Sequence, residues 1–269
     1  MALRQDGPPD EIRTRPWSRR DVLAGGVVAA VLGACSDTGD PRVTGAPTSA
    51  ASLPSTTTSP EDSALRALRA KDFEGLGMCK LLPEATAGPF PLDRLIERRD
   101  VTEGYPGHPF RLGLRAVDTR CEPVAGAVVE IWHADATGDY SAFVDGGSGK
   151  DESAGTTFMR GAQTAAEAGI VEFHTVYPGW YEGRAVHIHV RVHLDGALRW
   201  TGQMYFDEEY TRAVYATGVY AEFGNPDTSN EADTLAGDPA ADGTLLRTTR
   251  AETTAGTGTL GLLNLVVGV

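Results

Sequence analysis

The chain has 269 residues, which suits one large domain with extensions, and 41% of them are hydrophobic, enough for a real core. A formal net charge of −13 at pH 7 repels phosphate backbones and anionic lipid heads, so nucleic acid is excluded as an expected partner. With 32 glycines and few long helical patterns, the composition favours an all-β fold rich in turns.

Residues 1–34 are predicted to be an export signal rather than part of the fold. Arg19-Arg20 is a twin-arginine pair, and the apolar run after it is shorter than the roughly 20 residues that a bilayer span needs. The run ends in Leu-Gly-Ala-Cys at 32–35, which resembles the lipobox of bacterial lipoproteins. We therefore expect an exported protein of the cell envelope, lipid-anchored through Cys35 on the outer side of the cytoplasmic membrane. A short buried helix is the alternative.

Residues 35–74 are predicted to be a flexible tether. The stretch 36–60 consists mostly of Ser, Thr, Pro, Gly and Ala, which cannot bury enough surface to offset the entropy of ordering. Residues 64–70 are compatible with a short helix before the domain. The folded domain is expected over 75–269.

Two cysteines, Cys79 and Cys121, remain once Cys35 is assigned to the lipid. Outside the cytoplasm a lone pair of cysteines favours a disulfide. Two separate buried thiols are the alternative, because the spacing in sequence does not fix the geometry.

Short β-branched runs bounded by Gly, Pro or Asp turns predict the strands of a β-sandwich. They lie at 110–117, 126–133, 169–176, 186–194, 199–206 and 260–267, with a turn at Asp195-Gly196. Residues 207–216 predict a helix with Asp207 as its N-cap, because acidic residues fill the first turn. Residues 224–243 are expected to be a loop.

A His-Ile-His string suggests a metal site on the expected strand 186–194. Alternate side chains of a strand share a face, so His187 and His189 point the same way while Ile188 points into the core. A solvent-exposed histidine pair is the alternative. No Asp or Glu sits beside the pair, as a ferrous two-His-one-carboxylate site would need, but Tyr181 and Tyr140 are near in sequence. A phenol with a pKa of about 10 is deprotonated only by a hard, strongly Lewis-acidic cation, and ferric iron is one.

Four segments resemble the intradiol ring-cleavage dioxygenase family, which includes protocatechuate 3,4-dioxygenases and catechol 1,2-dioxygenases. They are PEATAGPF at 83–90, the run at 117–141, the run at 156–190 and TGQMYF at 201–206, in the family's order. The most specific part is the pattern GWYxGRxxHIH at 179–189.

The resemblance implies the fold, the cofactor and the reaction. Non-haem Fe(III) would be held by Tyr140, Tyr181, His187 and His189. Tyr181 would also act as a base toward the substrate, Arg184 would face the substrate ring, and Gln203 would orient reaction intermediates. The reaction would cleave a catechol ring with O₂ to a muconate-type diacid. For Arg184 the alternative is a salt bridge that ties down its loop.

The sequence leaves the substrate open among catechol, protocatechuate, hydroxyquinol and larger catecholic compounds, and it leaves homo-oligomerisation open too. His133 is interpreted as a buried histidine with hydrogen-bond partners, not as a fifth ligand. Two rival functions remain: a non-catalytic cell-surface β-sandwich binding module, and a zinc hydrolase that uses the histidine pair with a nearby carboxylate.

Overall fold

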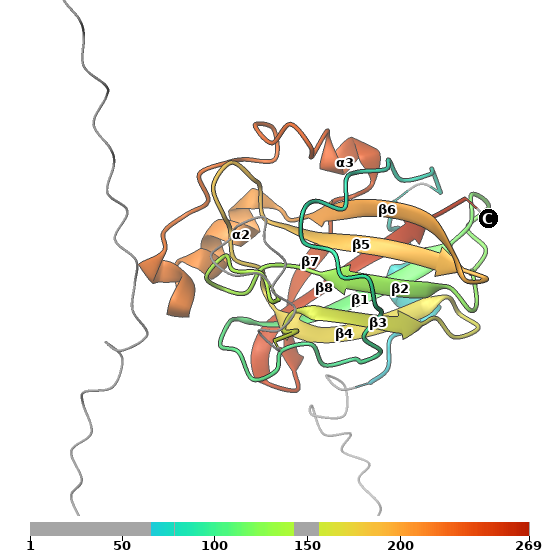
Figure 1. Cartoon of the computed structure of the whole chain (residues 1–269), viewed down its shortest axis with the longest axis horizontal. Helices are drawn as coiled ribbons and strands as arrows, with labels where there is room; N and C mark the ends of the chain where they lie inside the picture. The colour runs from blue at the N-terminus through green and yellow to red at the C-terminus, as the bar shows by residue number, and fades with distance from the viewer. Residues whose placement is uncertain (1–65, 78, 143–155, 269) are drawn as a thin grey trace, which may run out of the picture. The chain divides into compact units, whose positions relative to one another are not determined.

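The strands of the protein form two sheets that pack face to face (Figure 1). The computed structural model describes residues 66–77, 79–142 and 156–268. Within these residues, one sheet has the order β4-β1-β8-β7 and the other the order β3-β2-β5-β6. The first contains β1 (Pro109–Val117), β4 (Ile170–Val176), β7 (Arg247–Thr253) and β8 (Gly256–Val266). The second contains β2 (Val128–Trp132), β3 (Arg160–Thr164), β5 (His187–Leu194) and β6 (Ala197–Tyr205). The predicted all-β sandwich is confirmed.

The core lies between the sheets because apolar residues alternate along the strands. Ile188, Val190 and Val192 of β5 are fully buried in it, as are Leu112 and Leu114 of β1. The neighbours of β5 pair antiparallel with it, whereas β1 and β8 run parallel. The intervening side chains of each strand point away from the core, and in β5 these are His187, His189, Arg191 and His193.

All six predicted strands are present, but β3 and β7 were not predicted. The sequence of β3, RGAQT, has no large apolar residue, and β7, RTTRAET, is an edge strand whose side chains are mostly exposed or half-buried. Neither strand shows the alternation of apolar and polar residues on which strand prediction depends.

The helix and the turn after β5 form as expected. The helix α2 (Glu208–Tyr215) begins after Asp207, whose side chain accepts a hydrogen bond from the Tyr210 N–H at 2.8 Å. Asp195 and Gly196 both have positive φ, which gives the two-residue turn between β5 and β6 the twist that a hairpin requires.

Two details differ from expectation. The segment 224–243 includes a short helix, α3 (Pro239–Asp242), capped by Asp238. Residues 66–69 are not helical, and a single 3₁₀ turn, η1 (Ala70–Phe73), follows them instead. A second 3₁₀ turn, η3 (Gly218–Glu222), follows α2.

Residues 66–74, which the sequence analysis placed in the tether, contact the domain. Phe73 is buried, and the Arg111 side chain donates to the Arg66 carbonyl at 2.6 Å. The described residues that belong to the domain thus include positions before 75. The predicted signal, Cys35 and most of the predicted tether lie outside the described residues. In the part of the chain that the structure describes, no helix has the length and apolar character needed to cross a membrane.

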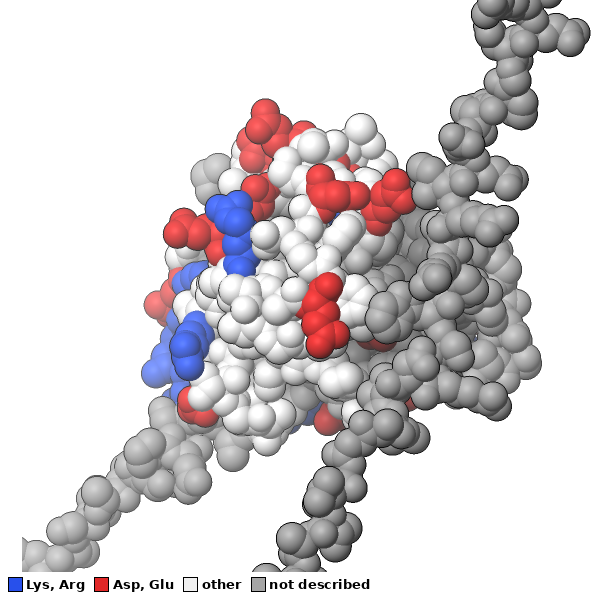
Figure 2. Space-filling view, turned by 90° about the vertical axis from the view of Figure 1, so that its left-hand side faces the viewer, with Lys and Arg blue, Asp and Glu red and all other residues white. Residues whose placement is uncertain are grey.

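The face at the left of Figure 1 carries scattered acidic side chains (Figure 2). The basic side chains visible in this view gather along one edge instead of forming a stripe across the face. This arrangement offers a phosphate backbone no continuous basic track on the visible part of the face.

The outward face of the β3-β2-β5-β6 sheet is covered by residues 85–98, the strap, which precede β1. Ala85 N–H donates to the Thr201 carbonyl of β6 at 3.0 Å, and Arg98 N–H donates to the Ala162 carbonyl of β3 at 3.1 Å. Upstream of this cover, Cys79 forms a disulfide with Cys121, with their Cα atoms 5.4 Å apart. Side chains on this sheet face therefore lie between a sheet and a strap, sheltered from water.

Candidate metal centre

β5 places two of its three histidines, His187 and His189, side by side under this strap. His187 and His189 are buried, and their Nε2 atoms are 3.1 Å apart. His187 Nδ1 lies 2.7 Å from the Ala185 carbonyl, to which it can only donate. The Nε2 atom of His187 is therefore the one that carries a lone pair, and it faces His189 and Tyr181.

Tyr181 reaches the same point from the loop before β5. Its hydroxyl lies 3.0 Å from His187 Nε2. This loop touches the loop that carries Tyr140, and glycines make the approach feasible: a Cβ on Gly179 would lie 2.3 Å from the Asp135 carbonyl, and one on Gly138 would lie 2.3 Å from the Trp180 carbonyl. The sequence thus brings two tyrosines from separate loops to one place.

Tyr140 lies at the end of a tight turn made by Asp135. The Asp135 carboxylate accepts hydrogen bonds from the N–H groups of Thr137 and Asp139 at 2.8 and 3.1 Å. The Tyr140 ring stacks on Phe90 of the strap, and its centroid is 5.7 Å from that of Tyr181 and 6.1 Å from that of His189. Its hydroxyl is buried and has no hydrogen-bond partner among the described residues.

His189 is held by ring stacking, in addition to the contact of its Nε2 atom with His187. Its ring lies parallel to that of Trp132 on β2, with an interplanar angle of 3° and centroids 4.9 Å apart. Its Nδ1 atom is buried with no partner within the described part of the chain. The two histidines therefore differ: a carbonyl orients one, and an indole face orients the other.

Burial dominates the electrostatics of these four side chains. It lowers the pKa of His187 to about 3, with help from the nearby Arg184 cation, and it lowers the pKa of His189 strongly. Burial also raises the pKa of Tyr181, and it raises that of Tyr140 strongly. The protein alone thus presents two neutral imidazoles and two protonated phenols.

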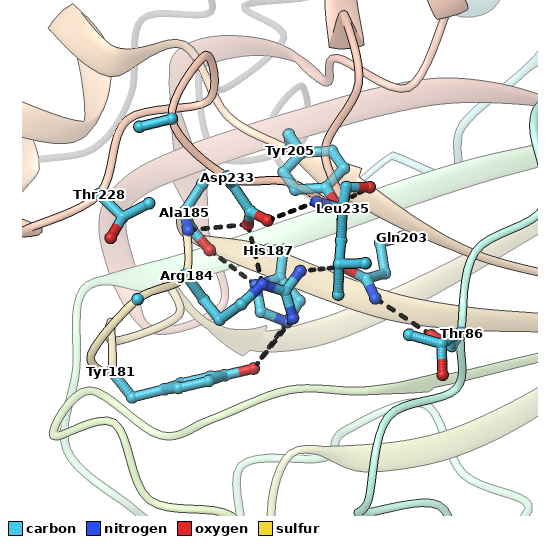
Figure 3. Close-up of polar contacts among 12 residues, drawn as sticks. Thr86, Tyr181, Arg184, Ala185, His187, Gln203, Tyr205, Thr228, Asp233 and Leu235 are labelled. Atoms are coloured by element: carbon cyan, nitrogen blue, oxygen red, sulfur yellow. Dashed lines mark hydrogen bonds and ion pairs between the residues drawn. The ribbon is translucent and has the colours of Figure 1, made fainter.

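Arg184 is fixed beside Tyr181 by two neighbours (Figure 3). Its Nε donates to Asp233 at 2.9 Å, its Nη2 donates to the Gln203 amide oxygen at 2.5 Å, and its Nη1 lies 3.5 Å from the Tyr181 hydroxyl. Burial acts to lower the pKa of Arg184, but Tyr181 and Asp233 outweigh it, so the pKa is raised and the group stays cationic. The salt bridge of the alternative interpretation is present, and the role of Arg184 toward a substrate ring stays a prediction.

The donor set fits a metal ion. Neighbouring ligands at right angles, each about 2.1 Å from one ion, lie about 3.0 Å apart. That is the spacing of Tyr181 Oη, His187 Nε2 and His189 Nε2, which are 3.0 and 3.1 Å apart in succession. Among the described residues no three His, Cys, Asp or Glu side chains gather to hold a metal, so the phenols would have to complete this site.

Among the described residues, the carboxylate beside the histidine pair is already engaged by other groups and is not available for the role a zinc hydrolase would need. Asp233 is the acid beside Arg184, and its oxygens accept hydrogen bonds from Arg184 Nε, from the Ala185 N–H and from the Leu235 N–H. Asp233 was not predicted, and no motif marks it in the sequence. Tyr205 and Thr86, which hold Gln203, were not predicted as site residues either.

His133 and His193 lie outside the donor set. His133 is buried, with its Nδ1 2.7 Å from the Ala134 carbonyl and its Nε2 2.8 Å from the Thr175 hydroxyl, as predicted for a core histidine. His193 lies further along β5, opposite Val128 of β2, whereas His189 lies opposite Trp132.

Comparison with known proteins gives one family throughout. A family model described as Dioxygenase matches residues 90–221. A chlorocatechol 1,2-dioxygenase of Rhodococcus opacus is 30% identical, with 45% of this chain and 52% of that protein covered. The chain thus spans about half the length of this relative. A catechol 1,2-dioxygenase of Acinetobacter lwoffii is 32% identical, with 37% of this chain and 36% of that protein covered.

Solved structures show the same likeness over a larger share of the chain. An intradiol ring-cleavage dioxygenase from Tetranychus urticae superposes with a TM-score of 0.64 at 30% identity, covering 71% of this chain and 95% of the other. The dioxygenase domain of a carbohydrate-binding fusion protein from Streptomyces sp. SirexAA-E gives a TM-score of 0.52 at 26% identity, with 71% and 99% covered.

Proposed function

The chain belongs to the intradiol ring-cleavage dioxygenase family, and we propose that it uses non-haem Fe(III) to cleave catechol-type rings with O₂ into muconate-type diacids. The observation that carries the proposal is the meeting of two buried phenols with two neutral imidazoles on one sheltered sheet face. A non-catalytic binding module would give no reason for this set of donors.

The chemistry of the donors favours ferric iron. Because burial raises the pKa of both tyrosines, only a strongly Lewis-acidic ion would displace their protons at neutral pH. Tyr140, Tyr181, His187 and His189 would hold the ion. A charge of +3 would then be balanced by two phenolates and one hydroxide, which avoids a net buried charge. When bound, the metal would hold the catechol as its dianion and make the ring reactive toward O₂.

The residues around the donors have separate tasks in this proposal. Tyr181, as a phenolate, would accept a proton from a catechol hydroxyl when the substrate binds. The Nη1 edge of Arg184, which faces Tyr181, would stabilise negative charge that develops on the ring oxygens. Gln203 is held by Tyr205 and by the Thr86 carbonyl, so its amide keeps one orientation toward Arg184.

The decisive experiment combines colour with turnover. Protein loaded with ferric iron should show a visible tyrosinate-to-iron absorption band, consume O₂ with members of a catechol panel, and release diacids. Tyr181→Phe should weaken the band and slow ring cleavage severely. A correctly folded, iron-loaded protein without colour would contradict the proposal, as would full activity of Tyr181→Phe.

We also propose that the protein is exported and anchored to the outer side of the cytoplasmic membrane through a lipid on Cys35. The order of twin arginines, apolar run and lipobox supports this, and a disulfide between Cys79 and Cys121 suits an oxidising compartment. Cys35→Ala should move the protein from the membrane fraction to the soluble fraction. An unchanged distribution would contradict the anchor.

A further inference from the structure

We propose that Asp233 is a positioning residue for the reaction: it fixes the Arg184 guanidinium in the orientation that leaves one N–H edge turned toward Tyr181. The inference rests on the proposed function, because the edge matters only if substrate binds beside Tyr181. Asp233 comes from the 224–243 segment, far along the chain from the rest of the site.

Asp233 is itself rigidly held. Its side chain has no exposed surface. One carboxylate oxygen accepts from Arg184 Nε at 2.9 Å and from the Ala185 N–H at 3.0 Å, and the other accepts from the Leu235 N–H at 2.9 Å. The carboxylate is thus clamped by two backbone groups, and its charge is presented to the guanidinium from one direction.

The second contact removes the remaining freedom of Arg184. Nη2 donates to the Gln203 amide oxygen, which also accepts from the Tyr205 hydroxyl at 2.9 Å. With Nε and Nη2 both engaged, the planar guanidinium cannot rotate, and Nη1 is the edge that faces Tyr181 (Figure 3). At 3.5 Å this Nη1 contact is too long for a strong hydrogen bond, so the edge can donate to a substrate oxygen.

Charge gives Asp233 a second reason to be there. An arginine with most of its side chain buried is costly unless an opposite charge accompanies it. The Asp233 carboxylate balances the charge of the Arg184 guanidinium from the side away from Tyr181. The guanidinium can therefore remain buried in the site. Positioning of this kind is what makes a fixed charge effective, since a displacement of about 1 Å can cost on the order of 100-fold in rate.

The test is a double-mutant cycle on iron-loaded protein with Asp233→Asn, Arg184→Ala and the double variant. We expect Asp233→Asn to lower kcat/KM by roughly 10- to 100-fold, the range for outer partners of site residues. If Asp233 acts through Arg184, adding Asp233→Asn to Arg184→Ala costs no more than about threefold. The tyrosinate-to-iron band should shift alike in all three variants.

Guanidinium ion provides a second measurement that a merely structural role would not affect. Added guanidinium should restore part of the activity of Arg184→Ala, because the Asp233 carboxylate can hold the ion where the side chain was. The double variant should not respond. The rescue of Arg184→Ala itself uses protein in which Asp233 is intact, so this measurement remains available even if Asp233→Asn folds poorly.

Asp227→Asn is the matched control. Asp227 lies on the same segment and its carboxylate faces the Gly183 N–H at 3.3 and 3.4 Å, but it does not contact Arg184 in the structure. We expect near wild-type activity and an unshifted band. Losses that multiply in the double variant, or guanidinium rescue that is independent of Asp233, would overturn the assignment while the proposed function stands. Wild-type protein that cleaves no catechol would remove both.

Discussion

The two outward faces of the sandwich both carry buried polar side chains, but these differ in whether other residues of the protein bind them. On the β4-β1-β8-β7 sheet, the buried carboxylate of Glu172 is surrounded by three basic groups: it contacts Arg99, accepts from Arg111 Nη2 at 2.7 Å and lies 3.2 Å from His174 Nε2. On the face of the β3-β2-β5-β6 sheet, the Tyr140 hydroxyl is buried with no hydrogen-bond partner among the described residues.

This difference indicates that the Glu172 cluster has a structural role, whereas the group around Tyr140 is suited to binding a ligand. A buried polar group with its full set of partners stabilises the fold, whereas one without partners costs about 1–3 kcal/mol of stability. Such a cost is retained where a ligand will supply the missing contact. Histidine content alone does not distinguish the faces, because each has a histidine among charged neighbours.

The largest expected effect comes from removing an unpartnered donor. Tyr140→Phe should lower ring-cleavage activity by more than about 100-fold, beyond the cost of losing an outer partner of a metal ligand. The free energy of unfolding of the metal-free protein should stay the same or rise, because no hydrogen bond is lost. Activity can be followed by O₂ uptake and stability by urea unfolding. A Tyr140→Phe variant that is less stable but fully active would show that Tyr140 has a structural role and would contradict the prediction.

A smaller effect, on stability and not on activity, is expected from the cluster around Glu172. Glu172→Gln should lower the free energy of unfolding by roughly 2–3 kcal/mol, because Arg111 remains buried without its countercharge. The visible band and kcat should be unchanged after iron loading. A loss of activity in the folded variant would show that this face also serves the reaction.

The smallest effect is in the pH dependence of that cluster. Burial acts to raise the pKa of Glu172, but His174, Arg111 and Arg99 outweigh it and hold the pKa well below its usual range. The stabilisation is therefore present above about pH 4.3, the pKa of an unfolded glutamate, and is lost as the pH falls through the folded value. The difference in unfolding free energy between wild type and Glu172→Gln should shrink on acidification. A constant difference would contradict the ion-pair account.

The elements that could be predicted from the sequence are those formed by interactions between residues close together in the chain. Local alternation predicted six strands, and the N-cap signal at Asp207 predicted α2. The strands β3 and β7 were missed because their stability comes from pairing with neighbours and not from an apolar pattern of their own.

The candidate site divides in the same way. Tyr181, Arg184, His187 and His189 lie within one short stretch, so a motif could indicate them. Asp233 and Thr86 reach the site only because the 224–243 segment and the strap fold back over β5 and β6. No local pattern distinguishes this aspartate from its acidic neighbours, so only the three-dimensional structure could single it out.

The position of β8 has a consequence for biosynthesis. This strand lies between β1 and β7, yet it leaves the ribosome after both. The sheet that contains β8 can therefore close only when nearly all of the described domain has been translated, whereas the strands that carry the histidines are complete at Tyr205. A nascent chain that lacks β8 would leave the facing edges of the apolar strand β1 and the polar strand β7 unpaired at the same time, which makes that stage of synthesis prone to aggregation.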